Sequence, residues 1–122
     1  MYIFHEDPGH GWIAVPVAEL IALNIANQIT SCSYIHGGLA YLEEDSDLPT
    51  FFEAKKAAGQ PLTFDGHNVR TIHKEVTPIR NYNSYTIEAV RDYMASRPDY
   101  VPSDTGDHGD MFSQASKQGQ LL

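Results

Sequence analysis

Three side chains that commonly bind metal ions lie within six residues near the N-terminus: His5, Asp7 and His10. Imidazole and carboxylate groups together form ligand sets for zinc and other divalent cations. Their spacing matches no strong metal signature, and Pro8 and Gly9 between them are typical of a turn. The segment therefore predicts a structured turn, with a ligand-contacting loop and the metal centre of a hydrolase as alternatives.

A run of carboxylates lies further along the chain and is a candidate binding site for a partner. Its acidic members are Glu43, Glu44, Asp45 and Asp47. They are close enough in sequence to attract a basic protein surface or a cation. The simpler interpretation is the polar end of a hairpin followed by a helix cap.

Aromatic and basic residues offer a third kind of chemistry, the binding of a planar phosphorylated ligand. Trp12, Tyr34 and Tyr41 have rings on which a nucleotide base could stack, although such residues more often belong to a core. The cations expected to meet phosphate are Arg70, Lys74 and Arg80. No glycine-rich phosphate loop and no local context for a nucleophile is present, so we assign no catalytic residue and no cofactor.

Charge is distributed very unevenly along the 122 residues. Residues 1–54 contain eight Asp and Glu and no Lys or Arg, whereas residues 55–97 contain seven Lys and Arg against four Asp and Glu. General nucleic-acid binding requires a basic face, and the first 54 residues supply no part of one. Direct nucleic-acid binding is therefore disfavoured, and any phosphate-bearing ligand should be met by residues 55–97.

Three β-hairpins are expected to position these groups. They join residues 2–5 to 12–15, 31–36 to 39–44, and 62–64 to 69–76. The middle hairpin has the strongest signal, because Gly37-Gly38 suits a two-residue turn with positive φ. That turn would set His36 opposite Leu39 and Tyr34 opposite Tyr41.

Three short helices complete the expected fold, over residues 18–23, 48–58 and 84–96. Asp47 and Ser84 are the expected N-caps of the second and third helix. Ile87, Val90 and Met94 form an apolar stripe on the third. Alternating hairpins and helices predict an α+β fold, with the helices packed on a mainly antiparallel sheet.

Residues 1–97 are expected to form a single α+β domain, followed by a polar acidic tail at residues 98–122. That tail includes the carboxylate-rich residues 104–110, which we interpret as solvated. The single cysteine, Cys32, is expected to be a small buried residue, in keeping with a reducing cytoplasm. The sequence has neither a long apolar run nor a signal peptide, so no membrane association is expected.

Part of the chain resembles small uncharacterised proteins encoded by phages and other mobile elements of bacteria. The resemblance covers about residues 1–59 and rests on residues 5–12 (HEDPGHGW), Ser33-Tyr34, Gly37-Gly38 and residues 40–47 (AYLEEDSD). That group has no assigned activity, so the resemblance implies no catalytic residue. It implies a context: a small acidic protein in the cytoplasm of a bacterial host cell, acting on host machinery or host defence.

These observations favour a non-enzymatic protein that presents its acidic run to the basic surface of a bacterial protein complex and inhibits it. The alternatives are a protein that sequesters a nucleotide or another small molecule, and a metal-dependent hydrolase. A homo-oligomer remains open, because a small chain encloses a ligand most readily between subunits.

Overall fold

The computed structural model of the chain describes residues 1–64 and 66–97. The strands are β1 (Tyr2–Glu6), β2 (Gly11–Pro16), β3 (Tyr34–His36), β4 (Leu39–Glu43), β5 (Val69–His73) and β6 (Asn83–Ser84). The helices are α1 (Val17–Ala22), α2 (Leu48–Ala57) and α3 (Ile87–Ala95), and the 3-10 turns are η1 (Ala26–Gln28) and η2 (Pro78–Asn81). The expected α+β class with three short helices is confirmed, and the predicted tail at residues 98–122 lies outside the described residues.

The six strands form one mixed sheet in the order β5-β1-β2-β4-β3-β6. Only β1 and β5 run parallel, and the other neighbours are antiparallel. The first two expected hairpins are confirmed as β1–β2 and β3–β4. The β3–β4 hairpin has the expected register, with Tyr34 opposite Tyr41 and His36 opposite Leu39.

The third expected hairpin is wrong. Residues 62–64 form no strand, and β5 pairs in parallel with β1, with Val69 opposite Tyr2. The Asn68 side chain accepts hydrogen bonds from the Thr63 amide and hydroxyl, at 2.7 and 2.9 Å, and so ties Thr63 to the residue that precedes β5. Val69 is buried beside β1, which explains why the strand extends the sheet instead of pairing locally.

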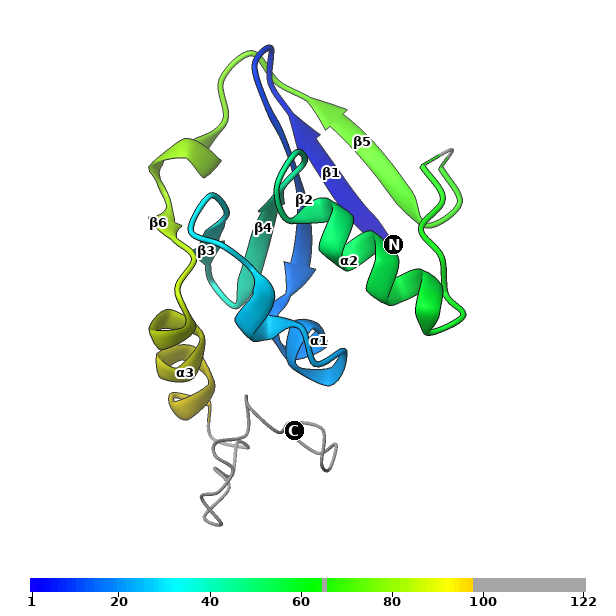
Figure 1. Cartoon of the computed structure of the whole chain (residues 1–122). Helices are drawn as coiled ribbons and strands as arrows, with labels where there is room; N and C mark the ends of the chain where they lie inside the picture. Colours follow the sequence, from blue (N-terminus) through cyan, green and yellow to red (C-terminus); the bar gives the residue numbers. More distant parts are fainter. Residues whose placement is uncertain (65, 98–122) are drawn as a thin grey trace.

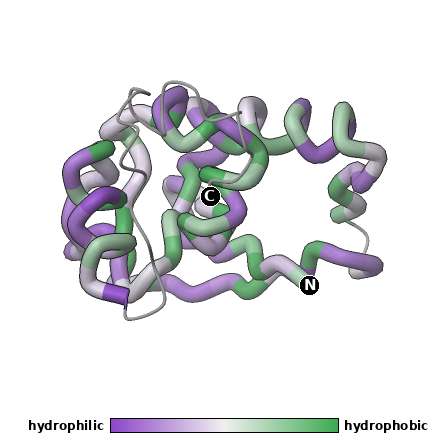
Figure 2. Tube along the Cα trace, turned by 90° about the horizontal axis from the view of Figure 1, so that it is seen from below, coloured by the Kyte–Doolittle hydropathy of each residue, from purple (hydrophilic) through white to green (hydrophobic). Residues whose placement is uncertain are grey.

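The helices cover one face of the sheet, and the main core lies between them. In Figure 1, α2 crosses in front of the strands, α1 lies at their lower end, and α3 lies below β6. Inward-facing side chains of β2 and β4 alternate with outward-facing ones along each strand. The inward ones are Ile13, Val15, Ala40 and Leu42, which pack against Leu20, Phe51 and Val90 of the helices. Hydrophobic and hydrophilic residues accordingly alternate at short intervals along the chain (Figure 2).

Both expected helix caps need correction. Asp47 precedes α2, but its side chain makes no capping bond; it is 1% exposed and accepts hydrogen bonds from the Thr30 amide, the Thr30 hydroxyl and the Ser33 hydroxyl. Ser84 belongs to β6, and the α3 cap is Thr86, whose hydroxyl accepts from the Ala89 amide at 3.0 Å.

Three further observations concern expectations from the sequence. The expected stripe on α3 is confirmed, with Val90 and Met94 buried and Ile87 packed against them. Cys32 is exposed, so the expectation of a buried cysteine is wrong. No helix in the described ranges is long and apolar enough to cross a membrane.

The turn of the central hairpin provides a direct test of the fold. Gly37 and Gly38 both have positive φ, at 59° and 83°, so alanine at either position carries a similar backbone strain of about 1 kcal/mol. A Cβ atom on Gly38 would also lie 2.5 Å from the Tyr93 hydroxyl, whereas one on Gly37 would meet nothing within 4 Å. Gly38→Ala should therefore destabilise the protein by about 1 kcal/mol more than Gly37→Ala in urea unfolding. Equal losses would mean that α3 does not pack on this turn.

Candidate binding surface

The face of the sheet opposite the helices carries a second, aromatic cluster. Trp12 on β2, Tyr34 on β3 and Tyr41 on β4 all point to this side, and the Trp12 and Tyr34 rings meet edge to face at 6.4 Å. The chain crosses back over them at η2, where Ile79 is buried against Trp12 and Tyr41. Tyr82 follows η2 and lies 5.2 Å from Tyr41, ring to ring. We call Trp12, Tyr34, Tyr41 and Tyr82 the aromatic face.

Three histidines border the aromatic face. His36 stacks on Tyr82 with ring centroids 4.2 Å apart and planes 7° from parallel. His5 lies 5.9 Å from the Tyr41 ring, and His10 lies 5.9 Å from the Trp12 ring. Burial, with a smaller contribution from Lys74, lowers the pKa of His5, which favours its neutral form. His36 and His10 are exposed, so the outer boundary of the face is accessible.

An ion pair between Asp7 and Arg80 holds η2 against the sheet. The Arg80 Nε and Nη2 atoms donate to the two carboxylate oxygens of Asp7 at 2.7 and 3.0 Å. Asp7 Oδ1 also accepts from the backbone amides of Gly9 and His10, which shapes the β1–β2 turn. The Arg80 guanidinium lies 5.4 Å from the centre of the Trp12 ring. These contacts join the turn, η2 and the aromatic face.

The predicted metal site at His5, Asp7 and His10 is not formed. Across residues 1–64 and 66–97, no three His, Cys, Asp or Glu side chains converge on a point that could hold a metal ion. Asp7 is occupied by Arg80 and by the turn amides, and hydrogen bonds from Arg80 hold its pKa well below the usual range of a carboxyl. The structured turn is therefore the interpretation that fits this segment.

The predicted acidic run is split by the fold. Asp47 is buried, as described above, and Glu43 is buried at the end of β4. The Oε1 atom of Glu43 accepts from the Asp45 and Ser46 amides at 2.9 and 3.0 Å, and its Oε2 atom lies 3.6 Å from His10 Nδ1. The expectation of four carboxylates presented together is wrong, because two of them bind other parts of the chain.

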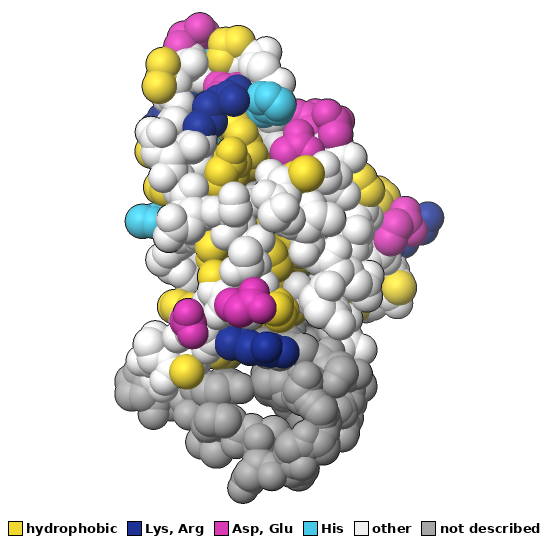
Figure 3. Space-filling view, turned by 60° about the vertical axis from the view of Figure 1, so that its left-hand side comes forward, with side chains coloured by type: hydrophobic (Ala, Val, Ile, Leu, Met, Phe, Trp, Pro, Cys, Tyr) yellow, Lys and Arg dark blue, Asp and Glu magenta, His cyan; other side chains and the backbone are white. Residues whose placement is uncertain are grey.

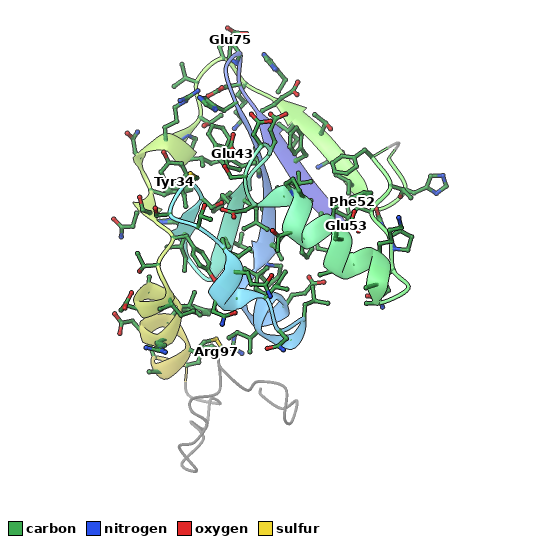
Figure 4. All side chains as sticks on the ribbon, in the orientation of Figure 1. Tyr34, Glu43, Phe52, Glu53, Glu75 and Arg97 are labelled. Carbon is green, nitrogen blue, oxygen red and sulfur yellow. The ribbon has the colours of Figure 1, made fainter. Side chains whose placement is uncertain are left out.

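The remaining two carboxylates, Glu44 and Asp45, are exposed, and we call them the acidic rim. Figure 4 labels Glu43, which precedes the rim, and Tyr34 on the neighbouring β3 strand. Burial raises the pKa of Glu44, and the nearby carboxylates of Asp45, Glu43 and Glu6 raise it further. Figure 3 shows acidic, histidine and basic side chains side by side near the upper end of the molecule. Glu44 follows Glu43, whose Oε2 atom lies 3.6 Å from His10 Nδ1, so the rim begins at the end of the sheet where His10 borders the aromatic face. The Glu44 carboxylate itself lies on the side of Gly11 that also carries Phe4, which is the helix side of the sheet.

The residues predicted to bind a planar phosphorylated ligand are only partly brought together. Trp12, Tyr34, Tyr41 and Arg80 are neighbours. Trp12 and Tyr41 are nevertheless buried by η2, so their rings are covered. Arg70 lies on β5 and Lys74 directly follows it, and β1 separates that strand from Trp12 on β2. Ligand binding by this set stays a prediction.

Sequence reasoning did not identify several residues of this surface. Tyr82 and Ile79 were missed because they come from a segment far away in sequence from Trp12, Tyr34 and Tyr41. His36 could have been found, since the hairpin register places it on the same face as Tyr34. Comparisons with models of protein families, with curated protein sequences and with solved structures gave no match, so the functional argument depends on the residues themselves.

The Asp7–Arg80 pair can be tested through stability and its pH dependence. A carboxylate whose pKa is lowered by folding stabilises the protein above its unfolded pKa, near 3.8, and that stabilisation is lost as the pH falls towards the folded value. Asp7→Asn should therefore lower the thermal midpoint at about pH 7, by about 5 °C. The difference from the wild type should shrink as the pH falls to about 2.5.

Trp12 is the only tryptophan, so its fluorescence reports on the same contact. The Asp7→Asn variant should shift its emission to longer wavelength if η2 loosens. Glu75→Gln, which changes an exposed carboxylate outside the pair, serves as the control and should leave the spectrum unchanged. An unchanged spectrum and midpoint in Asp7→Asn would show that the pair does not hold η2.

Proposed function

We propose that this protein is a non-catalytic binding protein that uses the acidic rim and the adjoining aromatic face to engage a basic surface of a bacterial protein complex. Its effect on that complex would be inhibition. The observation that supports the proposal most strongly is that Glu44 and Asp45 make no ion pair within the described residues. Glu43 and Asp47, by contrast, are bound inside the protein.

The chemistry of the surface suits a protein partner. Exposed carboxylates accelerate the encounter with a basic surface, and tyrosine and tryptophan residues are frequent among those that supply binding energy. Tyr34 and Tyr82 are half-buried and rigidly packed, so they would lose little conformational freedom on binding. The choice of a bacterial host complex as the target depends on the resemblance expected for residues 1–59 and is part of the proposal.

The position of Glu44 adds an energetic argument. Its pKa is raised by burial and by three neighbouring carboxylates, so its charged form is disfavoured in the folded protein. The turn also leaves little room at this point, because a Cβ atom on Gly11 would lie 2.6 Å from Glu44 Oε1. A carboxylate whose charged form destabilises the fold is expected at a position where a binding partner requires that charge. Glu44 fits this description.

The charge of the rim can be tested by reversal. Glu44→Lys combined with Asp45→Lys should abolish the salt-sensitive capture of host proteins from a bacterial lysate, because the attraction to a basic surface becomes repulsion. The measurement is quantitative mass spectrometry of proteins retained on the immobilised full chain at low and high salt. A retained protein should fall by about tenfold or more with the variant.

A matched control separates the position of the charge from its amount. Glu53→Lys combined with Asp92→Lys makes the same change in net charge, at exposed positions on α2 and α3. Capture by this control should match the wild type. If both variants retained equally less host protein, binding would depend on net charge and not on the rim, and the proposal would be overturned. Unchanged retention by the rim variant would overturn it as well.

Stability and binding should respond in opposite directions at Glu44. Glu44→Gln removes a disfavoured charge and should raise the thermal midpoint at about pH 7 by roughly 1–2 °C, since the exposed carboxyl is partly screened by solvent. The same variant should weaken capture of the host protein. A lower midpoint would show that the charged form of Glu44 stabilises the fold, contrary to the argument above.

A further inference from the structure

The outer edge of β5 is a second surface with unsatisfied binding capacity. β5 is the last strand on its side of the sheet, and Figure 1 shows it as the outermost strand. Its neighbour β1 occupies only one of its two edges. A free edge exposes a row of backbone N–H and C=O groups that can pair with another extended segment.

The register identifies the backbone groups that remain free. Lys74 donates its amide to the Glu6 carbonyl, and the Tyr2 amide donates to the Asn68 carbonyl. In a parallel ladder the bonded residues alternate, so Arg70 and Ile72 also face β1 and Thr71 and His73 face outward. The backbone groups of Thr71 and His73 make no hydrogen bond within the ranges 1–64 and 66–97.

The side chains beside this edge define a charge pattern. Arg70, Ile72 and Lys74 share the sheet face that carries His5, in the order basic, apolar, basic. Arg70 and Lys74 are exposed and make no ion pair with any described residue. Arg80 and Lys55, by comparison, are both paired, with Asp7 and Glu19 respectively. The β5 edge thus carries two cations that no ion pair with a described residue neutralises.

Carboxylates near the edge do not cancel this pattern. Among the described residues, Glu6 and Glu75 are the carboxylates that form hydrogen bonds with a β5 side chain, and both are bound by His73, at 3.2 and 3.1 Å. Glu6 and His73 are register partners and lie on the opposite face from Arg70 and Lys74. On the face of β5 that carries Ile72, the charged side chains of the described strand and of the residue after it are therefore Arg70 and Lys74, both positive.

A second copy of the chain fits this edge poorly. Antiparallel pairing of two β5 strands centred on Ile72 would place Arg70 directly opposite Lys74 of the other copy. Like charges directly opposite each other in a sheet are destabilising. An extended segment with acidic residues at the two flanking positions and an apolar residue between them would instead complement all three side chains.

We propose that the free edge of β5 binds an extended acidic peptide segment by adding it to the sheet as a seventh strand. The segment has the pattern acidic, any, apolar, any, acidic. Its backbone pairs with Thr71 and His73, and its carboxylates lie opposite Arg70 and Lys74. This surface is separate from the acidic rim, so the inference does not depend on the proposed function.

The test uses a fluorescein-labelled peptide with the core Glu-Thr-Val-Thr-Glu and measures its fluorescence anisotropy with the full chain. Thr71→Pro should weaken binding by about tenfold or more, because proline removes the outward amide and leaves the ladder to β1 intact. Lys74→Glu should weaken binding by about fivefold, whereas Lys56→Glu, an equal change on α2, should have no effect.

Two further measurements distinguish pairing from charge alone. The same peptide with methylated backbone amides keeps its carboxylates and should fail to bind. An oligothymidylate with the same number of negative charges as the peptide should not displace the labelled peptide. If it does, the edge is a general polyanion site and the inference is overturned. Binding that survives both Thr71→Pro and Lys74→Glu, or a dimer of the chain that Thr71→Pro dissociates, would also overturn it.

Discussion

The Asp7–Arg80 ion pair is the interaction on which the second half of this structure depends. It joins the β1–β2 turn to η2, and η2 in turn covers Trp12 and Tyr41. Without that cover, the sheet would expose large aromatic rings on the side away from the helices. The pair also offsets a cost, since the Trp12 Nε1 and Thr77 Oγ1 atoms are buried without a hydrogen-bond partner among the described residues. A buried donor left unsatisfied costs about 1–3 kcal/mol, so the attachment of η2 comes from the ion pair and from apolar contacts.

A similar rule applies to Asp47 on the helix side of the sheet. Its carboxylate gathers Thr30 and Ser33, and the Ser33 hydroxyl also accepts from the Glu43 amide at 3.0 Å. The connection before β3 is thereby tied to the start of α2, at a place where the chain has no regular structure. A buried carboxylate requires such partners, because an unpaired charge in the interior is strongly unfavourable. Asp7 therefore fixes η2 on one side of the sheet, and Asp47 fixes the segment before β3 to the start of α2 on the other side.

Local signals were sufficient to predict the elements but not their long-range partners. Gly37-Gly38 encodes its hairpin because positive φ is required at both positions, and the register then follows from the two-residue turn. The parallel pairing of β5 with β1 was missed because it joins residues about 67 positions apart, and no local pattern specifies such a partner. The same holds for the candidate site, where Trp12, Tyr34 and Tyr41 were recognised as a group, but Tyr82 reaches them only through the return of η2. Asp47 was assigned as a cap for the same reason, since its partner Thr30 lies 17 residues away.

Internal bonding provides a way to separate structural charges from those left for binding. Asp7, Glu43 and Asp47 each accept at least two hydrogen bonds from the chain, and all three are buried. Glu44 and Asp45 lie beside them in sequence, yet no side-chain hydrogen bond within the described residues involves their carboxylates. On the basic side, Lys55 and Arg80 are paired, whereas Arg70 and Lys74 are not. The two unneutralised groups differ in sign and lie on different parts of the sheet, so one rigid framework separates an acidic surface from a basic edge. A partner of either charge would therefore be directed to one of them and repelled by the other, which net charge alone would not predict.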